Sequence, residues 1–191
     1  MSHYIVKRDA PANRKRYCDA GIEHHFPEAA VMIAFAMHLF AHGAREVELH
    51  PDGEHGKRFD LSRCLQILGF KHTFGQGKTS YGGTHKRGQQ KLSITVKPGL
   101  GDVVAKMNGH WLVAECKGGV VNSQHAGQAS RLRRGLCLTR PLDGERQVAV
   151  VPSTPLTRKV ASRLSPRART AGIEIALVDP MGNVAFLDKL N

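Results

Sequence analysis

Long apolar runs are absent from this chain. The longest of them, Ala29–Met37, is too short to cross a lipid bilayer. The first residues, MSHYIVKRDAPANRKRY, are too polar and too charged for a signal peptide. From these absences we expect a cytoplasmic protein that has no membrane partner.

Closely spaced cysteine pairs are also lacking. The four cysteines are far apart and form no CxxC motif: Cys18, Cys64, Cys116 and Cys137. Because structural zinc sites commonly use such pairs, we do not expect one here. The spacing favours four reduced thiols, which is typical of cytosolic proteins.

Acidic residues are few in comparison with basic ones. Lys and Arg number 28 against 16 Asp and Glu, and the formal net charge is +12. This surplus favours a polyanionic partner, of which nucleic acid is the simplest.

Neither an internal repeat nor a second domain boundary is visible, and 191 residues that are 41% hydrophobic suit a single domain with a real core. Within 1–191 we distinguish a basic, irregular N-terminal arm (1–25), a basic glycine-rich loop (71–90) and the part that carries the motifs described below (91–152). A DNA-contacting role for the arm is an alternative to a mobile one.

Periodicity and capping signals predict the regular elements of the chain. Helices are expected over 26–41, 60–68, 124–137 and 154–171. Strands are expected over 45–50, 92–96, 102–107, 110–117, 147–151, 173–178 and 184–187. The first helix is apolar on nearly every side, so we expect it to be buried.

The most informative stretch is PGLGDVVAKMNGHWLVAECKGG, residues 98–119. Its dipeptide Asn108-Gly109 is a strong signal for a two-residue type I′ hairpin turn. A turn centred there pairs 107 with 110 and 105 with 112, and therefore sets Asp102 opposite Glu115. Since side chains alternate along a strand, Lys117 shares the face of Glu115.

Two carboxylates directly opposite each other in a hairpin repel. A hard divalent cation with oxygen ligands, such as Mg²⁺, would remove that repulsion. The basic charge and the adjacent lysine argue against the other use of a carboxylate pair, the acid–base chemistry of glycosidases. An ordinary surface hairpin with a charge cluster is the plain alternative.

An Asp followed by Glu-x-Lys on the next strand resembles the motif of the PD-(D/E)xK nuclease superfamily. Here the motif reads Gly101-Asp102 and then Glu115-Cys116-Lys117, with Gly where the family often has Pro. The resemblance implies an α/β fold with a restriction-endonuclease-like core, in which helices flank a mixed central β-sheet in the order αβββαβ. The remaining residues would form a C-terminal α/β extension. The three strands of the core are expected as a meander formed by 92–96 and the hairpin.

The resemblance also implies an activity and roles for residues. It indicates a Mg²⁺-dependent endonuclease, for which Mn²⁺ is a second metal, with Asp102, Glu115 and Lys117 as catalytic residues. The metal ligands would be Asp102, Glu115, the main-chain carbonyl of Cys116 and an acid from the first helix, for which Glu28 is the candidate. Stabilisation of the helix dipole is the alternative role of Glu28.

Contacts with nucleic acid are expected from two segments. Four candidates lie on the helix after the hairpin: Gln124, Gln128, Arg131 and Arg134. Lys86 and Arg87 in the glycine-rich loop are the others. A solvated helix face and a solvated loop are the alternatives.

Two functional classes therefore remain. The first is a metal-dependent nuclease, for which we expect DNA as the substrate, in restriction, repair, recombination or phage defence. The second is a non-cleaving nucleic-acid-binding module with a nuclease-like fold. The sequence leaves a homodimer, and accessory proteins of defence or repair, open as further partners.

Overall fold

The computed structural model describes residues 2–52, 54–75, 79–96, 101–122, 136 and 144–187. The helices are α1 (Glu28–Ala41), α2 (His55–Arg58), α3 (Leu61–Ile67) and α5 (Pro155–Thr170), with 3₁₀ turns η1 (Lys15–Tyr17) and η2 (Asp19–Gly21). The strands are β1 (Val6–Asp9), β2 (Ile22–Phe26), β3 (Glu46–Leu49), β4 (Lys71–Phe74), β5 (Gly83–Arg87), β6 (Gln90–Ile94), β7 (Val103–Met107), β8 (His110–Cys116), β9 (Gly119–Val120), β10 (Glu145–Pro152), β11 (Ile173–Val178) and β12 (Val184–Phe186).

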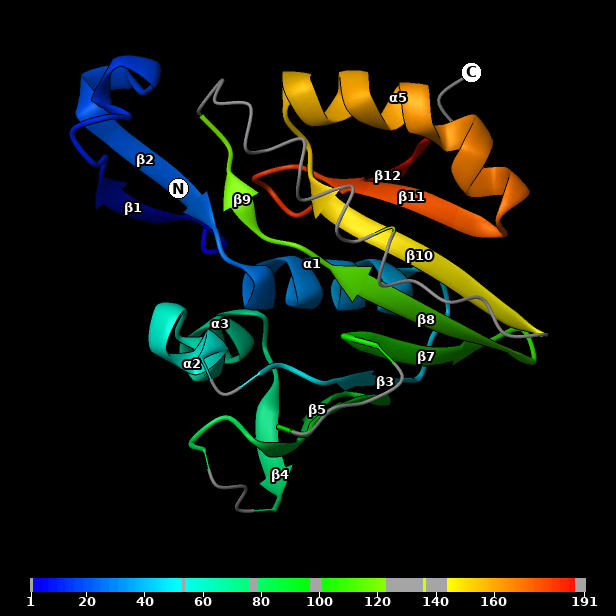
Figure 1. The fold of residues 1–191 in the computed structure, drawn as a ribbon. Coiled ribbons are helices and arrows are strands. Elements are labelled where there is room, and N and C mark those ends of the chain that lie inside the picture. The colour runs from blue at the N-terminus through cyan, green and yellow to red at the C-terminus, as the bar shows by residue number, and fades with distance from the viewer. Residues whose placement is uncertain are drawn as a thin grey trace.

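A large mixed sheet organises the molecule (Figure 1). Within the described residues it has nine strands, in the order β12-β11-β10-β8-β7-β3-β6-β5-β4. Strands β8, β10 and β11 are parallel, whereas β7 runs antiparallel to both β8 and β3. A smaller sheet, ordered β1-β2-β9, lies to one side and joins the large one through the chain that continues from β8 into β9.

Helices cover both faces of the large sheet. Helix α1 is buried over most of its length, as expected, and crosses one face against strands from β3 to β12. On the other face α5 packs on β10 and β11, where Ala161 and Ala168 form one buried cluster with Ala149, Val151 and Ile175. The structure is therefore α/β, with a mixed sheet between helices. In the described parts of the chain, no helix combines the length and the apolar character that crossing a membrane requires.

The hairpin of β7 and β8 has the predicted register. Met107 pairs with His110, Ala105 with Leu112 and Val103 with Ala114. Asn108 and Gly109 have φ angles of 51° and 84°, the positive values that a type I′ turn requires.

Three expectations about the elements are wrong. The neighbour of β7 is β3 and not β6, so residues 92–96 do not form a meander with the hairpin. Two parts of the segment 71–90, expected as a loop, form β4 and β5, which extend the sheet beyond β6. The segment 1–25, expected as an irregular arm, contains β1 and most of β2, which pair antiparallel.

The other expected elements agree with the structure where it describes them. Asp60 caps α3 by accepting a hydrogen bond from the Arg63 main-chain N–H, and Thr154 caps α5 within a capping box. The helix expected over 124–137 lies outside the described residues apart from Leu136, which packs with the α5 cluster.

Candidate active site

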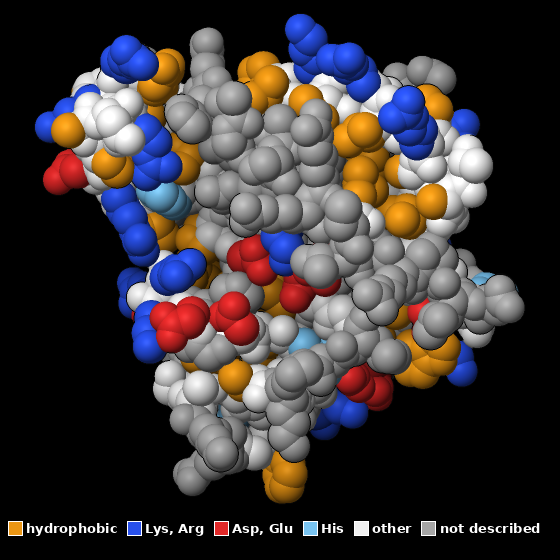
Figure 2. Space-filling model, viewed as in Figure 1, with side chains coloured by type: hydrophobic (Ala, Val, Ile, Leu, Met, Phe, Trp, Pro, Cys, Tyr) orange, Lys and Arg blue, Asp and Glu red, His pale blue; other side chains and the backbone are white. Residues whose placement is uncertain are grey.

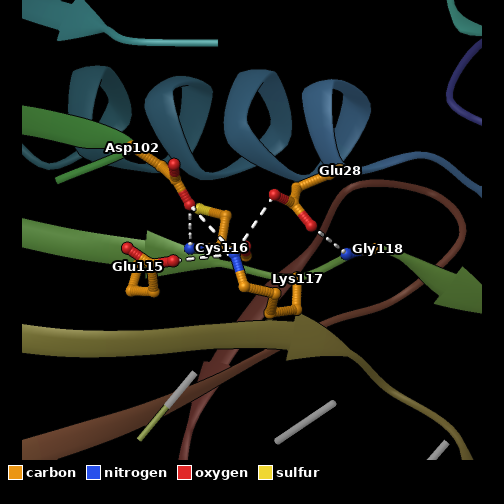
Figure 3. Close-up of polar contacts among 6 residues, drawn as sticks. All are labelled: Glu28, Asp102, Glu115, Cys116, Lys117 and Gly118. Carbon is orange, nitrogen blue, oxygen red and sulfur yellow. Dashed lines mark hydrogen bonds and ion pairs between the residues drawn. The ribbon is translucent and has the colours of Figure 1, made fainter. Parts of the chain in front are cut away.

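Three carboxylates converge on the ammonium group of Lys117 (Figure 3). Lys117 Nζ lies 2.7 Å from Glu115 Oε1, 3.1 Å from Glu28 Oε1 and 3.7 Å from Asp102 Oδ2. All four side chains are between 17% and 24% exposed, so they are shielded but still reach solvent. The structure therefore brings together the proposed catalytic residues and the acid from the first helix.

Each of these side chains comes from the end of an element. Glu28 is the first residue of α1, Asp102 immediately precedes β7, Glu115 is in β8, and Lys117 follows β8. Continuing the hairpin register by one pair sets Asp102 across from Glu115, as predicted. In the view of Figure 2, acidic side chains surround a basic one near the middle of the molecule, where Figure 1 has β8 and the start of α1.

Asp102 is held in an environment that resists its ionisation. Burial and the nearby charge of Glu115 raise its pKa from 3.8 to about 6, although Lys117 and a hydrogen bond from the Cys116 main-chain N–H, 2.7 Å long, oppose the rise. A carboxylic acid with a pKa near neutrality is typical of functional sites.

Lys117 remains a cation in this cluster. Burial alone would lower its pKa, but the hydrogen bond to Glu115 and the charges of Glu28 and Asp102 outweigh burial and raise the pKa above its ordinary value. Its ammonium also donates a hydrogen bond of 2.8 Å to the Cys116 carbonyl oxygen. That carbonyl, which the family resemblance suggests as a metal ligand, therefore lies at the cluster.

Two glycines allow the backbone to bring these residues together. A Cβ atom on Gly118 would lie 2.5 Å from the Glu28 nitrogen and 2.7 Å from the Phe26 carbonyl oxygen. A Cβ atom on Gly101 would lie 2.6 Å from Val113 Cγ1. The chain beside Asp102 therefore has little room for a side chain at position 101.

The donor set suits a hard divalent cation, since it consists of three carboxylates and one main-chain carbonyl. Among the described residues, no three His, Cys, Asp or Glu side chains form a group arranged to hold a metal ion. The carboxylates point instead at Lys117, whose single positive charge offsets part of their negative charge. The chemistry of the residues fits Mg²⁺ or Mn²⁺, and binding would place the metal in competition with Lys117 for the same oxygens.

The Cys116 thiol belongs to the core and not to the site. It is fully buried on the face covered by α1, opposite to the face of Glu115, and burial raises its pKa well above the ordinary value. Cys18, Cys64 and Cys116 are free thiols, whereas Cys137 lies outside the described residues.

The residues expected to contact nucleic acid are only partly described. Gln124, Gln128, Arg131 and Arg134 lie outside the described residues. The other two candidates, Lys86 and Arg87, are on β5. In the sheet, β5 is separated from β8 by β7, β3 and β6.

Lys86 is exposed, and in the strand register it lies opposite Lys71 of β4 on one side and Lys91 of β6 on the other. Arg87 stacks on the Phe70 ring at 4.7 Å and donates to the Leu68 carbonyl, so it has a structural role.

Sequence reasoning missed a basic pocket that adjoins the cluster. Its basic lining consists of Arg8, Arg14, His25 and Arg58. The sequence signal was faint, because these residues are dispersed over the first 58 positions and only the tertiary structure gathers them.

In comparisons with protein-family models, with curated proteins and with solved structures, no match to this chain was found.

Proposed function

We propose that this protein is a metal-dependent nuclease that hydrolyses phosphodiester bonds, with DNA as its substrate in restriction, repair, recombination or phage defence. The observation that carries the proposal is the convergence of Glu28, Asp102 and Glu115 on Lys117. An acid from a first helix, an Asp, and a Glu-x-Lys on the next strand are the residues that the PD-(D/E)xK motif brings together.

The order of elements supports a restriction-endonuclease-like core. Helix α1 is followed by β3, β7 and β8, which are neighbours in the sheet, and later by β10 beside β8. With the helix expected over 124–137, this order is αβββαβ. Strands β4 to β6 are then an insertion, and α5, β11 and β12 are the C-terminal extension.

Hydrolysis of a phosphodiester requires a positioned water and neutralisation of charge at the phosphate. A bound Mg²⁺ or Mn²⁺ would supply Lewis acidity and charge neutralisation. Asp102, Glu115 and the Cys116 carbonyl would hold it, and Glu28 would complete the acidic side of the site. Lys117 would orient the attacking water or stabilise negative charge on the phosphate.

Helix α5 supports a polyanionic substrate. Its sequence, PLTRKVASRLSPRART, has five basic residues and no acidic one. The basic side chains are exposed, and Lys and Arg atoms lie along the α5 edge of the molecule in Figure 2. Such a surface attracts phosphate backbones without reading their sequence.

The proposal is tested by incubating the full chain with linear, single-stranded, nicked, branched and RNA substrates, in Mg²⁺, in Mn²⁺ and in chelator. We expect cleavage that requires the metal. Intact substrates at high protein concentration with either metal would overturn the proposal.

A non-cleaving nucleic-acid-binding module is the second candidate. The specific observation in its favour is that Lys117 already contacts all three carboxylates, as it would in a purely structural ion-pair cluster. Salt-sensitive binding of DNA without metal-dependent cleavage would distinguish this module from a nuclease.

A further inference from the structure

A basic pocket of about 310 Å³ opens beside the carboxylate–lysine cluster. Glu28 and Gly118 line the pocket and also belong to the cluster, where Glu28 contacts Lys117 and its Oε2 accepts a hydrogen bond of 3.4 Å from the Gly118 N–H. The pocket and the candidate active site therefore share Glu28 and Gly118, whose contact is drawn in Figure 3.

A buried carboxylate positions part of the basic lining. Glu23 on β2 is 1% exposed, and it lies 3.1 Å from Arg14 Nε and 2.9 Å from His25 Nε2. A buried charge is tolerated only when it is paired, so these contacts are strongly favoured. Glu23 consequently holds Arg14 and His25 at the pocket.

Two further arginines line the pocket without carboxylate partners. Arg8 faces Glu23 in the β1–β2 register, and its Nη2 donates a hydrogen bond of 3.4 Å to the Arg58 carbonyl oxygen. In the part of the chain that the structure describes, neither Arg8 nor Arg58 forms an ion pair. Guanidinium groups bind phosphate oxygens in a bidentate manner, so two of them at one pocket suit a phosphate group.

We propose that this pocket binds a phosphate group of the nucleic-acid strand whose scissile phosphodiester lies at Lys117. The inference rests on the proposed function and adds a second contact on the same strand. A strand carries one phosphate for about every 3.4 Å of duplex axis, so a pocket that shares a wall with the site can hold a phosphate close to the scissile one. The phosphate is either the terminal one at a 5′ end or an internal one of a continuous strand.

The test measures binding of the full chain in chelator, so that no cleavage takes place. The probes are a short duplex with 5′-phosphate ends, the same duplex with 5′-hydroxyl ends, and a closed circular DNA as competitor. The variants are Arg8→Gln and Arg58→Gln. Arg14 is left unchanged because its removal would leave Glu23 buried and less well paired. Lys7→Gln is the matched control, since Lys7 is exposed and points to the opposite face of β1 from Arg8.

We expect each arginine variant to raise the dissociation constant about five- to tenfold at about 0.1 M salt and to reduce the salt slope by about one, while Lys7→Gln changes neither. A terminal phosphate is indicated if wild type prefers the 5′-phosphorylated duplex and both arginine variants lose that preference. An internal phosphate is indicated if the circle competes as well as the linear duplexes and the variants weaken all three equally.

Arginine variants that bind every probe as Lys7→Gln does would overturn the inference. A chain that binds as expected in chelator but cuts nothing in Mg²⁺ or Mn²⁺ would instead overturn the nuclease proposal and leave the phosphate pocket standing.

Discussion

Asp102 is the residue whose raised pKa gives a measurable effect of the site's electrostatics on stability. Its folded pKa of about 6 lies above the ordinary 3.8, so the folded protein binds this proton more tightly than the unfolded chain does. Ionisation of Asp102 therefore lowers the free energy of unfolding above pH 6, and this loss disappears as the pH falls from 6 to below 4. The difference between the two pKa values corresponds to about 3 kcal/mol at most.

Asp102→Asn should therefore be more stable than wild type at pH 7.5 and equally stable near pH 4. Asn can still accept the hydrogen bond from the Cys116 N–H, which leaves removal of the charge as the main change. Urea unfolding in chelator at both pH values measures the effect. Asp9→Asn, exposed on β1, is the control and should stay within about 0.5 kcal/mol of wild type. A destabilised Asp102→Asn at pH 7.5 would show that the carboxylate supports the fold.

Lys117→Met separates the chemistry from metal binding. The substitution leaves three carboxylates without their shared cation, so the metal-free protein should lose stability at neutral pH. Metal binding should be retained, because the ligands remain, while the cleavage rate should fall by about 100-fold or more. Calorimetric titration with Mn²⁺ and an initial-rate assay give the two readouts.

The control for Lys117→Met is Lys106→Met, which removes an exposed lysine from the same hairpin. Loss of Mn²⁺ binding in Lys117→Met would mean that the lysine holds the site together and does not serve the chemistry.

At the level of elements, the β7–β8 hairpin could be predicted residue by residue. The Asn108-Gly109 turn sets the register, and a slip by one residue would turn one carboxylate to the other face of the sheet. Local sequence therefore encodes the relation of Asp102 to Glu115. The placement of Glu28 could only be proposed from family resemblance, because it depends on how α1 packs across the sheet.

Strands β4 and β5 were missed because the sequence around them resembles a loop. Glycine and polar residues dominate 71–90, and these disfavour strands when they are judged locally. In the folded protein β5 pairs with strands on both sides and buries His85, so tertiary contacts override the local preference. The neighbour of β7 could not be predicted from the sequence either, because β3 precedes it by more than fifty residues along the chain.

The junction of β8, β9 and α1 depends on Gly118. Gly118→Ala would push a Cβ atom against the Glu28 nitrogen and the Phe26 carbonyl, both backbone atoms that cannot move independently. We expect a loss of about 1–3 kcal/mol in the free energy of unfolding, and a reduced cleavage rate even at temperatures where the variant is folded.

Gly43→Ala is the control for this junction. Gly43 has a φ of +98° with nothing within 4 Å of a Cβ atom, so its substitution adds backbone strain at the end of α1 without crowding the site. It should lower the melting temperature but spare the rate of the folded protein. Equal effects of both variants on the rate would mean that Gly118 has no special relation to Glu28.

At the scale of the whole molecule, the surplus of basic residues should make DNA binding strongly dependent on salt. The double variant Arg163→Gln/Arg167→Gln on α5 should weaken binding and reduce the salt slope by about two, because each lost phosphate contact releases one counterion fewer. Arg45→Gln/Lys106→Gln, which removes the same charge elsewhere on the exposed surface, is the control. Fluorescence anisotropy over a salt series measures both. Identical slopes for the two double variants would remove α5 from the interface.

We propose that Glu28, Asp102, Glu115 and Lys117 form a metal-dependent phosphodiesterase site. The most direct test is the initial rate of cleavage of an end-labelled DNA as a function of Mg²⁺ concentration, for wild type and for Glu115→Gln. Wild type should show no cleavage in chelator and a rate that saturates with Mg²⁺, and Glu115→Gln should be slower by about 100-fold or more while it stays folded. Equal rates for the two proteins, or cleavage by wild type that persists in chelator, would contradict the claim.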